Sequence, residues 1–287
     1  MEARRRRIGA GERNTDMEIE KGTEVCLEKL GQADMILAGL GEEFDGGKAL
    51  GRSSEYQNGQ ETLKKAGLGW LVPAWKEYCR GRLSGLEGGD TPEAYALRKL
   101  AGLLEGKNYF VVSVSTNSQI ARTPWREGRL VMPCGSILRK QCILGDGELE
   151  ELSREDGEKL NRAMEELYQG HFSPEVKSFL GQCPRCGSSL VLNNVYGEEY
   201  DEKGYLDQWH MYTKWLQGTL NRKLLVLELG VGMRFPSVVR WPFEKAAFLN
   251  QKAFFARVNE ELYQLDENLS GKGCGIPQNA VDWLCRL

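Results

Sequence analysis

Four short segments of the sequence are almost wholly apolar, and each ends in a turn that contains Gly or Asn. They lie at residues 35–38, 109–114, 224–229 and 253–258, with helical patterns between them. Strands that are apolar on every side are typical of parallel sheets covered by helices on both faces. The sequence therefore predicts an α/β fold with a doubly wound, mostly parallel, Rossmann-like sheet. In such a sheet, ligands bind at the carboxyl ends of the strands.

The composition is that of a soluble globular protein, with 41% hydrophobic residues, 28% charged residues and a formal net charge of -3. No apolar run is long enough to cross a bilayer, and no apolar stretch follows the charged start as a secretory signal requires. We therefore expect a cytoplasmic protein without a membrane partner. Residues 1–14, which include four consecutive arginines, are expected to form a disordered basic arm. The chain as a whole lacks a basic footprint, so no nucleic-acid partner is expected.

The chain divides into a large domain and a small insert. We expect residues 15–141 and 188–287 to form the Rossmann-like domain. Residues 142–187 are expected to form a small cysteine-bearing insert, because they contain few apolar segments and a charged helix that begins after Ser153. Residues 45–59 are polar and glycine-rich and predict a long loop, and loops of that length are often functional lids.

Cys183 and Cys186 form a Cys-x-x-Cys pair, a turn that points two thiolates at one metal ion. Cys142 is the nearest upstream candidate for a third ligand. Further candidates are Cys134, Asp146 and His171. A structural zinc takes four ligands and no second Cys-x-x-Cys pair is present. Bound zinc and a reduced, metal-free turn therefore both remain open.

The first apolar segment runs into the turn Gly39-Leu40-Gly41. Glycines at this place let a backbone approach a pyrophosphate closely. The next residues, Glu42 and Glu43, would repel a phosphate unless they point away or hold a ribose. The turn alone is therefore a weak sign of phosphate binding.

The second apolar segment is followed by polar side chains, including Thr116, Asn117 and Gln119. Their amide and hydroxyl groups suit the orientation of a ribose or a water, but none is a strong base. The simpler interpretation of this segment is a helix cap or an Asx turn. The chain has only His171 and His210, so no histidine general base is expected at this rim.

Taken in order, these segments resemble the sirtuin family. The residues that carry the resemblance are Gly39-Leu40-Gly41, the loop 115–119, Cys134-Gly135, Cys142 with Cys183 and Cys186, Gly230-Val231-Gly232, Val258-Asn259 and Gly273-Cys274-Gly275. Residues 227–259, with Pro236 and Pro242-Phe243, look especially like the bacterial macrodomain-linked branch. That branch is associated with protein ADP-ribosylation.

The resemblance implies that the chain binds NAD and possesses a zinc-type insert. The cofactor-binding residues that it implies are Gly39, Gly41, Thr116, Asn117, Gly230, Gly232, Asn259 and Cys274, the last of these in a turn that covers the adenine. The catalytic positions that it implies are Asn117, Gln119 and Cys134. The metal ligands that it implies are Cys142, Cys183 and Cys186.

Two departures from the family pattern bear on the reaction. Cys134 stands where the family has its catalytic histidine, and Gln119 stands where it has an aspartate. A thiol is a poor group for moving a proton from a ribose hydroxyl. We therefore expect cleavage of the nicotinamide–ribose bond of NAD with transfer of ADP-ribose to a protein, or to water, rather than lysine deacylation. The alternatives are a catalytically silent module that binds NAD or ADP-ribose, an NAD-dependent protein deacylase, and a structural protein on the same scaffold.

Overall fold

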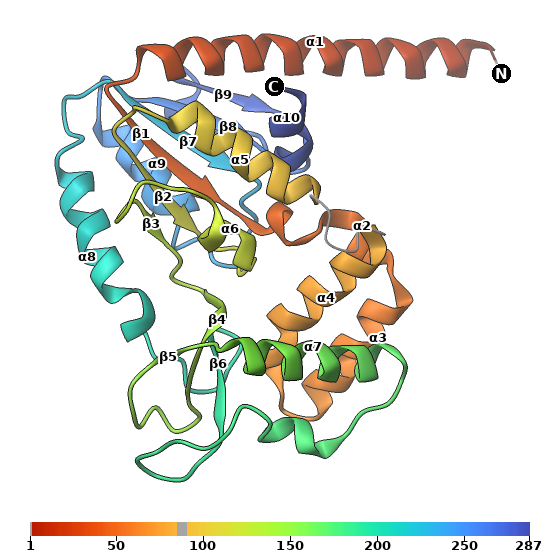
Figure 1. The fold of residues 1–287 in the computed structure, drawn as a ribbon. Helices are drawn as coiled ribbons and strands as arrows, with labels where there is room; N and C mark the ends of the chain where they lie inside the picture. The colour runs from red at the N-terminus through yellow and green to blue at the C-terminus, as the bar shows by residue number, and fades with distance from the viewer. Residues whose placement is uncertain (1, 85–90) are drawn as a thin grey trace.

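The computed structural model describes residues 2–84 and 91–287 and centres on a six-stranded sheet (Figure 1). The strands are β1 (Met35–Leu40), β2 (Tyr109–Ser113), β3 (Leu130–Val131), β7 (Leu224–Leu229), β8 (Phe254–Val258) and β9 (Gly273–Ile276). Their order is β3-β2-β1-β7-β8-β9, and every neighbouring pair is parallel. The predicted doubly wound, Rossmann-like α/β fold is confirmed.

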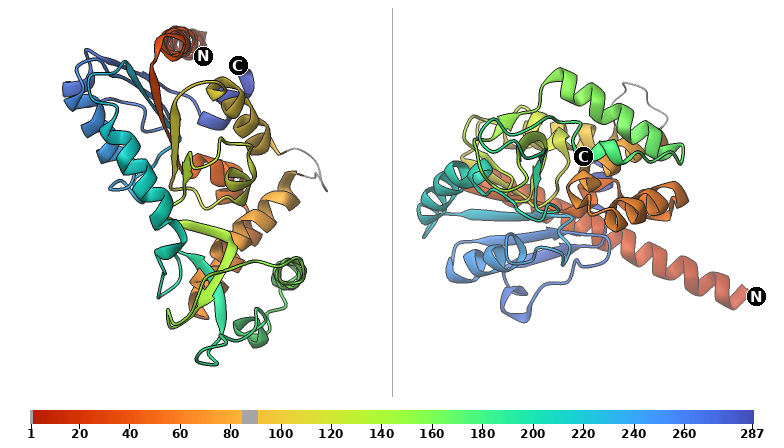
Figure 2. Two further views of the ribbon diagram at one scale, coloured as in Figure 1. Left: turned by 60° about the vertical axis from the view of Figure 1, so that its left-hand side comes forward. Right: turned by 90° about the horizontal axis from the view of Figure 1, so that it is seen from below.

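Helices cover both faces of this sheet (Figure 2). On one face lie α1 (Glu2–Gln32), α5 (Pro92–Leu104) and α10 (Ala280–Arg286), which share a core that includes Leu97 and Trp283. On the other face lie α8 (Lys203–Gln217) and α9 (Arg240–Leu249), which contribute Trp215 and Phe243. Every residue of β1, β2 and β7 is buried as a result, which explains the continuous apolar segments of the sequence.

Helix α1 begins at Glu2, so most of the segment expected to be a disordered arm is helical. Residue 1 and the side chains of residues 2–14 lie outside the described part of the chain. The expectation rested on charge, but Glu, Arg and Ala are all favourable helix formers and continue the helix that buries Cys26 and Leu30. In Figure 1 the amino-terminal part of α1 extends well beyond the sheet. Neither α1 nor any other described helix is long and apolar enough to span a membrane.

The region expected to be a long loop, residues 45–59, is mostly helical, and that prediction was wrong. A 3₁₀ turn (Glu42–Asp45) leads into α2 (Gly47–Arg52) and α3 (Ser54–Lys65), and α4 (Val72–Ser84) follows. Ser53 caps α3 by accepting a hydrogen bond from the backbone N–H of Tyr56 at 3.2 Å. Gly59 lies against the indole of Trp75, where a Cβ would come within 2.3 Å of a ring carbon. Tertiary packing therefore outweighs the low helix propensity of this glycine-rich sequence.

The cysteine-bearing segment belongs to a second lobe, at the bottom of Figure 1. It contains an antiparallel sheet of order β5-β4-β6, made of β4 (Gly135–Cys142), β5 (Glu150–Glu151) and β6 (Leu190–Asn194). Helix α7 (Arg154–Tyr168) begins at a capping box formed by Ser153 and Asp156. The core of the lobe joins this segment to the helices before it, and its members include Leu63, Trp75, Leu160 and Leu190. The insert predicted at residues 142–187 thus shares one core with residues 50–79, which were predicted to belong to the large domain.

Candidate functional site

A cavity of about 380 Å³ opens at the carboxyl rim of the sheet, where the strand order reverses between β1 and β7. Three turns wall it: residues 42–45 after β1, residues 230–234 after β7 and residues 259–262 after β8. Open parallel sheets bind ligands at this point. The volume is also within the range of about 300–1,000 Å³ that small-molecule sites occupy.

The first two of these turns approach so closely that only glycine fits between them. A Cβ on Gly41 would lie 2.2 Å from the carbonyl oxygen of Gly230 and 2.2 Å from the Cα of Val231. Gly230 itself has a φ of 63°, in the left-handed region that favours glycine. The backbone N–H of Glu43 donates to the carbonyl of Gly230 at 3.2 Å. The turns after β1 and β7 therefore form one rigid backbone unit under the cavity.

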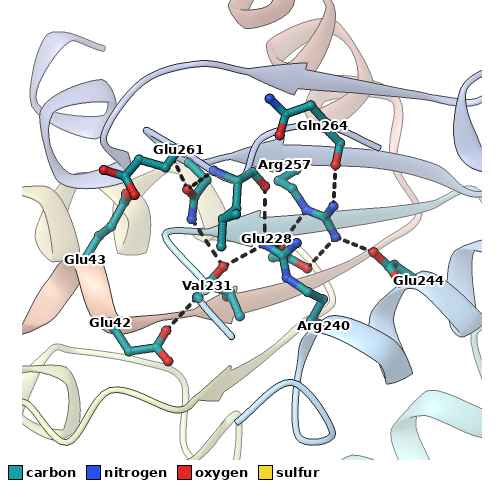
Figure 3. Close-up of polar contacts among 12 residues, drawn as sticks. Glu42, Glu43, Glu228, Val231, Arg240, Glu244, Arg257, Glu261 and Gln264 are labelled. Atoms are coloured by element: carbon teal, nitrogen blue, oxygen red, sulfur yellow. Dashed lines mark hydrogen bonds and ion pairs between the residues drawn. The ribbon is translucent and has the colours of Figure 1, made fainter. Parts of the chain in front are cut away.

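Both glutamates of the first turn point into the rim, where backbone N–H groups hold them (Figure 3). The N–H of Gly232 donates to Glu42 Oε2 at 2.6 Å. The N–H groups of Glu260 and Ala280 donate to Glu43 Oε1 and Oε2 at 2.9 and 2.6 Å. Burial raises the pKa of Glu43 to about 7, although its two backbone donors act in the opposite direction. Among the described residues, the other oxygen of Glu42 is buried without a hydrogen-bond partner.

Beneath the rim lies a buried ion-pair network (Figure 3). Arg257 of β8 pairs with Glu228 of β7 and with Glu244 of α9, each at 2.6 Å. Arg257 also donates to the carbonyl of Gln264 at 2.6 Å. Burial opposes the charge of Arg257, but the two carboxylates raise its pKa above the ordinary value. The network therefore ties the centre of the sheet to the loop that follows β8.

A second arginine extends the network to the cavity wall. Arg240 lies 3.3 Å from Glu228 and donates to the backbone carbonyls of Val231 and Leu262 at 2.8 and 3.3 Å. It thereby joins the turns after β7 and β8. This network was not predicted from the sequence, although two opposite charges inside apolar strands were a usable signal: Glu228 and Arg257 are direct partners in the strand register.

The inner end of the cavity is a polar cluster between the two lobes. Asp45 accepts a hydrogen bond from the hydroxyl of Ser115 at 2.5 Å and forms an ion pair with Lys76 at 2.9 Å. Arg234 stacks over the ring of Tyr196, with its guanidinium carbon 4.4 Å from the ring centroid. Burial opposes the charge of Lys76, but the carboxylate of Asp45 raises its pKa. Ser115 belongs to the predicted loop 115–119, but the other members of the cluster were not predicted, because they come from segments far apart in the chain.

Asn117 lies behind this cluster, and its side-chain amide is engaged by the protein. Its Nδ2 donates to the carbonyl of Phe44 at 2.8 Å, and its Oδ1 accepts from Arg80 at 3.2 Å and from the backbone N–H of Gln119 at 3.0 Å. The last contact makes Asn117 the N-cap of α6 (Ser118–Arg122), which is the simpler of the two interpretations of this segment. Asn117 and Thr116 are both buried, and neither is among the residues that line the cavity.

The other two predicted catalytic residues also lie outside the cavity lining. The side chain of Gln119 accepts a hydrogen bond from the hydroxyl of Thr91 at 3.0 Å. Cys134 is buried, and burial raises its pKa to about 12, with further contributions from the carboxylates of Glu42 and Asp45. It therefore remains a neutral thiol at neutral pH.

Of the predicted cofactor-binding residues, Gly230, Gly232 and Asn259 line the cavity. Gly39 lies within β1, against α9. Cys274 lies in strand β9, opposite Ala256 of β8, and its sulfur is 3.8 Å from the carbonyl oxygen of a residue in α1. The prediction of a turn at residues 273–275 was therefore wrong, because these residues belong to the edge strand of the sheet.

The three predicted metal ligands come together in the second lobe. The sulfur atoms of Cys142, Cys183 and Cys186 all lie within 4.8 Å of one another, and those of Cys142 and Cys186 are 3.5 Å apart. Hydrogen bonds from Ser188 lower the pKa of Cys186 to about 7. Tetrahedral zinc with Zn–S bonds of about 2.3 Å sets its sulfur ligands roughly 3.8 Å apart, so the cluster fits three zinc ligands. No fourth His, Cys, Asp or Glu in the described part of the chain completes the group.

The fold is that of the Sir2 enzymes, or sirtuins. A Sir2 structure with a p53 peptide and NAD+ aligns with a TM-score of 0.51 over 91% of this chain and 94% of its own, at 14% identity. A Sir2 homologue in complex with NAD aligns with a TM-score of 0.50 over 92% of both chains, also at 14% identity. No family model matches the sequence. The predicted resemblance to the sirtuins is confirmed at the level of the fold.

Two curated proteins are similar in sequence. The chain is 22% identical over 266 residues to a protein ADP-ribosyltransferase of Staphylococcus aureus, which covers 88% of this chain and 82% of that protein. It is 26% identical over 146 residues to a probable bifunctional ADP-ribose hydrolase/ADP-ribosyltransferase of Fusarium oxysporum f. sp. cubense. The second match spans 48% of this chain and only 23% of the fungal protein.

Proposed function

We propose that this protein binds NAD at the carboxyl rim, cleaves the nicotinamide–ribose bond and transfers ADP-ribose to a protein or to water. The observation that carries the proposal is the cavity at the switch point of a Sir2-like sheet, walled by the turns after β1, β7 and β8. Solved structures of the same fold hold NAD. Both curated relatives are named for ADP-ribosyl transfer, and NAD is the ordinary donor for that reaction.

The rim would hold the dinucleotide mainly through its backbone. Gly230 and Gly232 bring main-chain groups to the surface of the cavity, because neither has a side chain to cover them. Asn259 stiffens the next turn: its Oδ1 accepts from the backbone N–H groups of Glu261 and Leu262 at 3.0 and 2.7 Å. The ion-pair network of Arg257 and Arg240 then fixes the turns after β7 and β8 relative to each other.

Cleavage of the nicotinamide–ribose bond passes through a cation-like transition state, which placed charges stabilise. Asp45 lines the cavity, and Ser115 and Lys76 fix the orientation of its carboxylate. We assign Asp45 the role of stabilising the positive charge that develops on the ribose. Asn117 would act indirectly, since it holds the carbonyl of Phe44 and thereby positions the residue that follows. We give Gln119 and Cys134 no direct contact with the substrate.

Transfer is favoured over deacylation by the environment of Cys134. This residue stands at the position of the family's histidine and is a buried thiol with a raised pKa. A group that stays protonated at neutral pH cannot accept a proton from a ribose hydroxyl.

The direct test uses NAD labelled in its adenylate part. Release of nicotinamide and labelling of protein are measured for the wild type and for Asp45→Asn and Asn117→Ala. Wild-type rates above those of both variants are expected. Rates that do not exceed those of the variants would contradict the proposal.

A second candidate is a catalytically silent module that binds NAD or ADP-ribose. It is favoured by one observation, namely that Glu42 and Glu43 already occupy backbone donors of the rim. Calorimetric binding without any release of nicotinamide would select this function.

We propose that zinc binds Cys142, Cys183 and Cys186 and joins the end of β4 to the turn that precedes β6, so its role would be to stiffen the second lobe. We also propose a cytoplasmic location, where the eight thiols, all free in the structure, would stay reduced. An acceptor protein is part of the same proposal, and mass spectrometry of labelled proteins would identify it.

A further inference from the structure

We infer that Glu42 and Glu43 determine the ligand specificity of the rim: their carboxylates occupy the backbone N–H groups that a pyrophosphate would take, so the site disfavours ligands with phosphates relative to nucleosides. The inference rests on the proposed dinucleotide site. It adds to that site a built-in competitor that every phosphorylated ligand must displace.

The occupied donors come from three separate segments. The N–H of Gly232 follows β7, that of Glu260 follows β8, and that of Ala280 lies where the chain enters α10. Backbone N–H groups at the carboxyl ends of parallel strands are the usual partners of ligand phosphates. Here two consecutive side chains take all three at 2.6 to 2.9 Å. When ionised, each carboxylate carries the same sign of charge as a phosphate and accepts hydrogen bonds in the same way, so it is a direct competitor.

The placement of both carboxylates is fixed by the backbone beneath them. Glu43 lies in the 3₁₀ turn, and its backbone N–H donates to the carbonyl of Gly230. A Cβ on Gly230 would come within 2.6 Å of the Glu43 side chain. The Glu42 carboxylate likewise lies next to Gly232, with an oxygen 3.1 Å from the place that a Cβ on Gly232 would take. The absence of side chains at Gly230 and Gly232 therefore leaves the space that the two glutamate side chains occupy.

Glu42 is the less firmly held of the two. It accepts one rim N–H, and among the described residues its second oxygen is buried without a partner. A buried acceptor without a partner is costly, and such departures from local rules concentrate at functional sites. Glu42 is thus the side chain that a ligand would displace first.

Calorimetric titration of the full chain with ADP-ribose and with adenosine tests the inference. The proteins are the wild type, Glu42→Ala, Glu43→Ala and the double variant. Glu261→Ala is the matched control, because Glu261 lines the same cavity and its removal takes away one negative charge while leaving the three N–H groups occupied. Thermal unfolding without ligand checks that each variant is folded. If Glu43→Ala does not fold, Glu42→Ala, which loses a single hydrogen bond, still tests the inference.

Each vacated donor should tighten ADP-ribose binding by about tenfold, the equivalent of one charge-assisted hydrogen bond. Adenosine, which has no phosphate, should bind the variants and the wild type alike, within about twofold. The control should leave the affinity for ADP-ribose far closer to wild type.

Three results would overturn the inference. If ADP-ribose binds the wild type and the Glu42 and Glu43 variants with equal affinity, the two carboxylates do not compete with phosphate, although the proposed dinucleotide site is retained. If adenosine tightens as much as ADP-ribose, or the control matches the test variants, the effect is not specific to phosphate. If neither probe binds any of the proteins, the proposed function fails and the inference fails with it.

Discussion

Replacement of Arg257 by Met removes the central cation of the buried network while keeping most of the side-chain volume. Arg257 is 1% exposed, Glu228 is 0% exposed, and the pair is joined by contacts of 2.6 and 3.2 Å. Removal of one partner from a buried ion pair costs about 3–5 kcal/mol, because the other charge is left without compensation. Arg240 remains 3.3 Å from Glu228, and Glu244 can reach solvent. We therefore expect a loss near the lower limit, about 3 kcal/mol.

Urea unfolding measures this loss as a fall in the midpoint at an unchanged slope. The double variant Glu228→Gln/Arg257→Met should recover part of the stability, since it removes both buried charges. Arg154→Met is the matched control: Arg154 pairs with Glu158 on the surface, and this variant should unfold like the wild type. A single variant as stable as the control, or a double variant less stable than Arg257→Met, would refute this account of the network.

Three further predictions concern the site and the second lobe. Asp45→Asn should lower nicotinamide release at least about tenfold while leaving ADP-ribose affinity within about twofold, because it acts on the transition state; equal losses in both would contradict the assignment. Burial, with smaller contributions from the carboxylates of Glu260 and Asp282, raises the folded pKa of Glu43 to about 7 from its ordinary 4.5. The stability it contributes is complete below pH 4.5 and is lost as the pH rises through 7. Relative to Glu43→Gln, the wild type should therefore lose up to about 2 kcal/mol between pH 5 and 8, and parallel pH profiles of the two proteins would contradict this. A chelator should lower the melting temperature of the wild type and leave that of Cys183→Ala unchanged, whereas equal shifts would argue against bound zinc.

The central strands could be predicted from sequence because burial on both faces leaves an unbroken apolar signature. β1, β2, β7 and β8 all begin and end close to the predicted segments. β9 could not be found this way: Gly273 and Gly275 give it the composition of a turn, and it pairs with only one neighbour, β8. The first part of helix α3 was assigned to a loop for a related reason, since the contact of Gly59 with Trp75, which explains why this glycine-bearing sequence is helical, depends on tertiary packing.

The rim could be predicted in outline but not in its chemistry. Parallel strands place their carboxyl ends at one edge, so the turns at Gly41, Gly230 and Asn259 follow from the fold class. The pairing of Asp45 with Lys76 depends on how the second lobe folds against the sheet, and no local pattern encodes it. The sequence did indicate that the acidic pair after Gly41 conflicts with phosphate, and the structure adds that backbone N–H groups hold both carboxylates at the rim.

Amide hydrogen exchange of the wild type with and without saturating ADP-ribose tests the central claim most directly, because it locates the ligand on the chain. If the rim binds the ligand, exchange slows in peptides that cover residues 41–46, 230–234 and 259–262 and stays unchanged in the second lobe around the three cysteines. Protection confined to other peptides, or no protection anywhere at saturating ligand, would contradict the account.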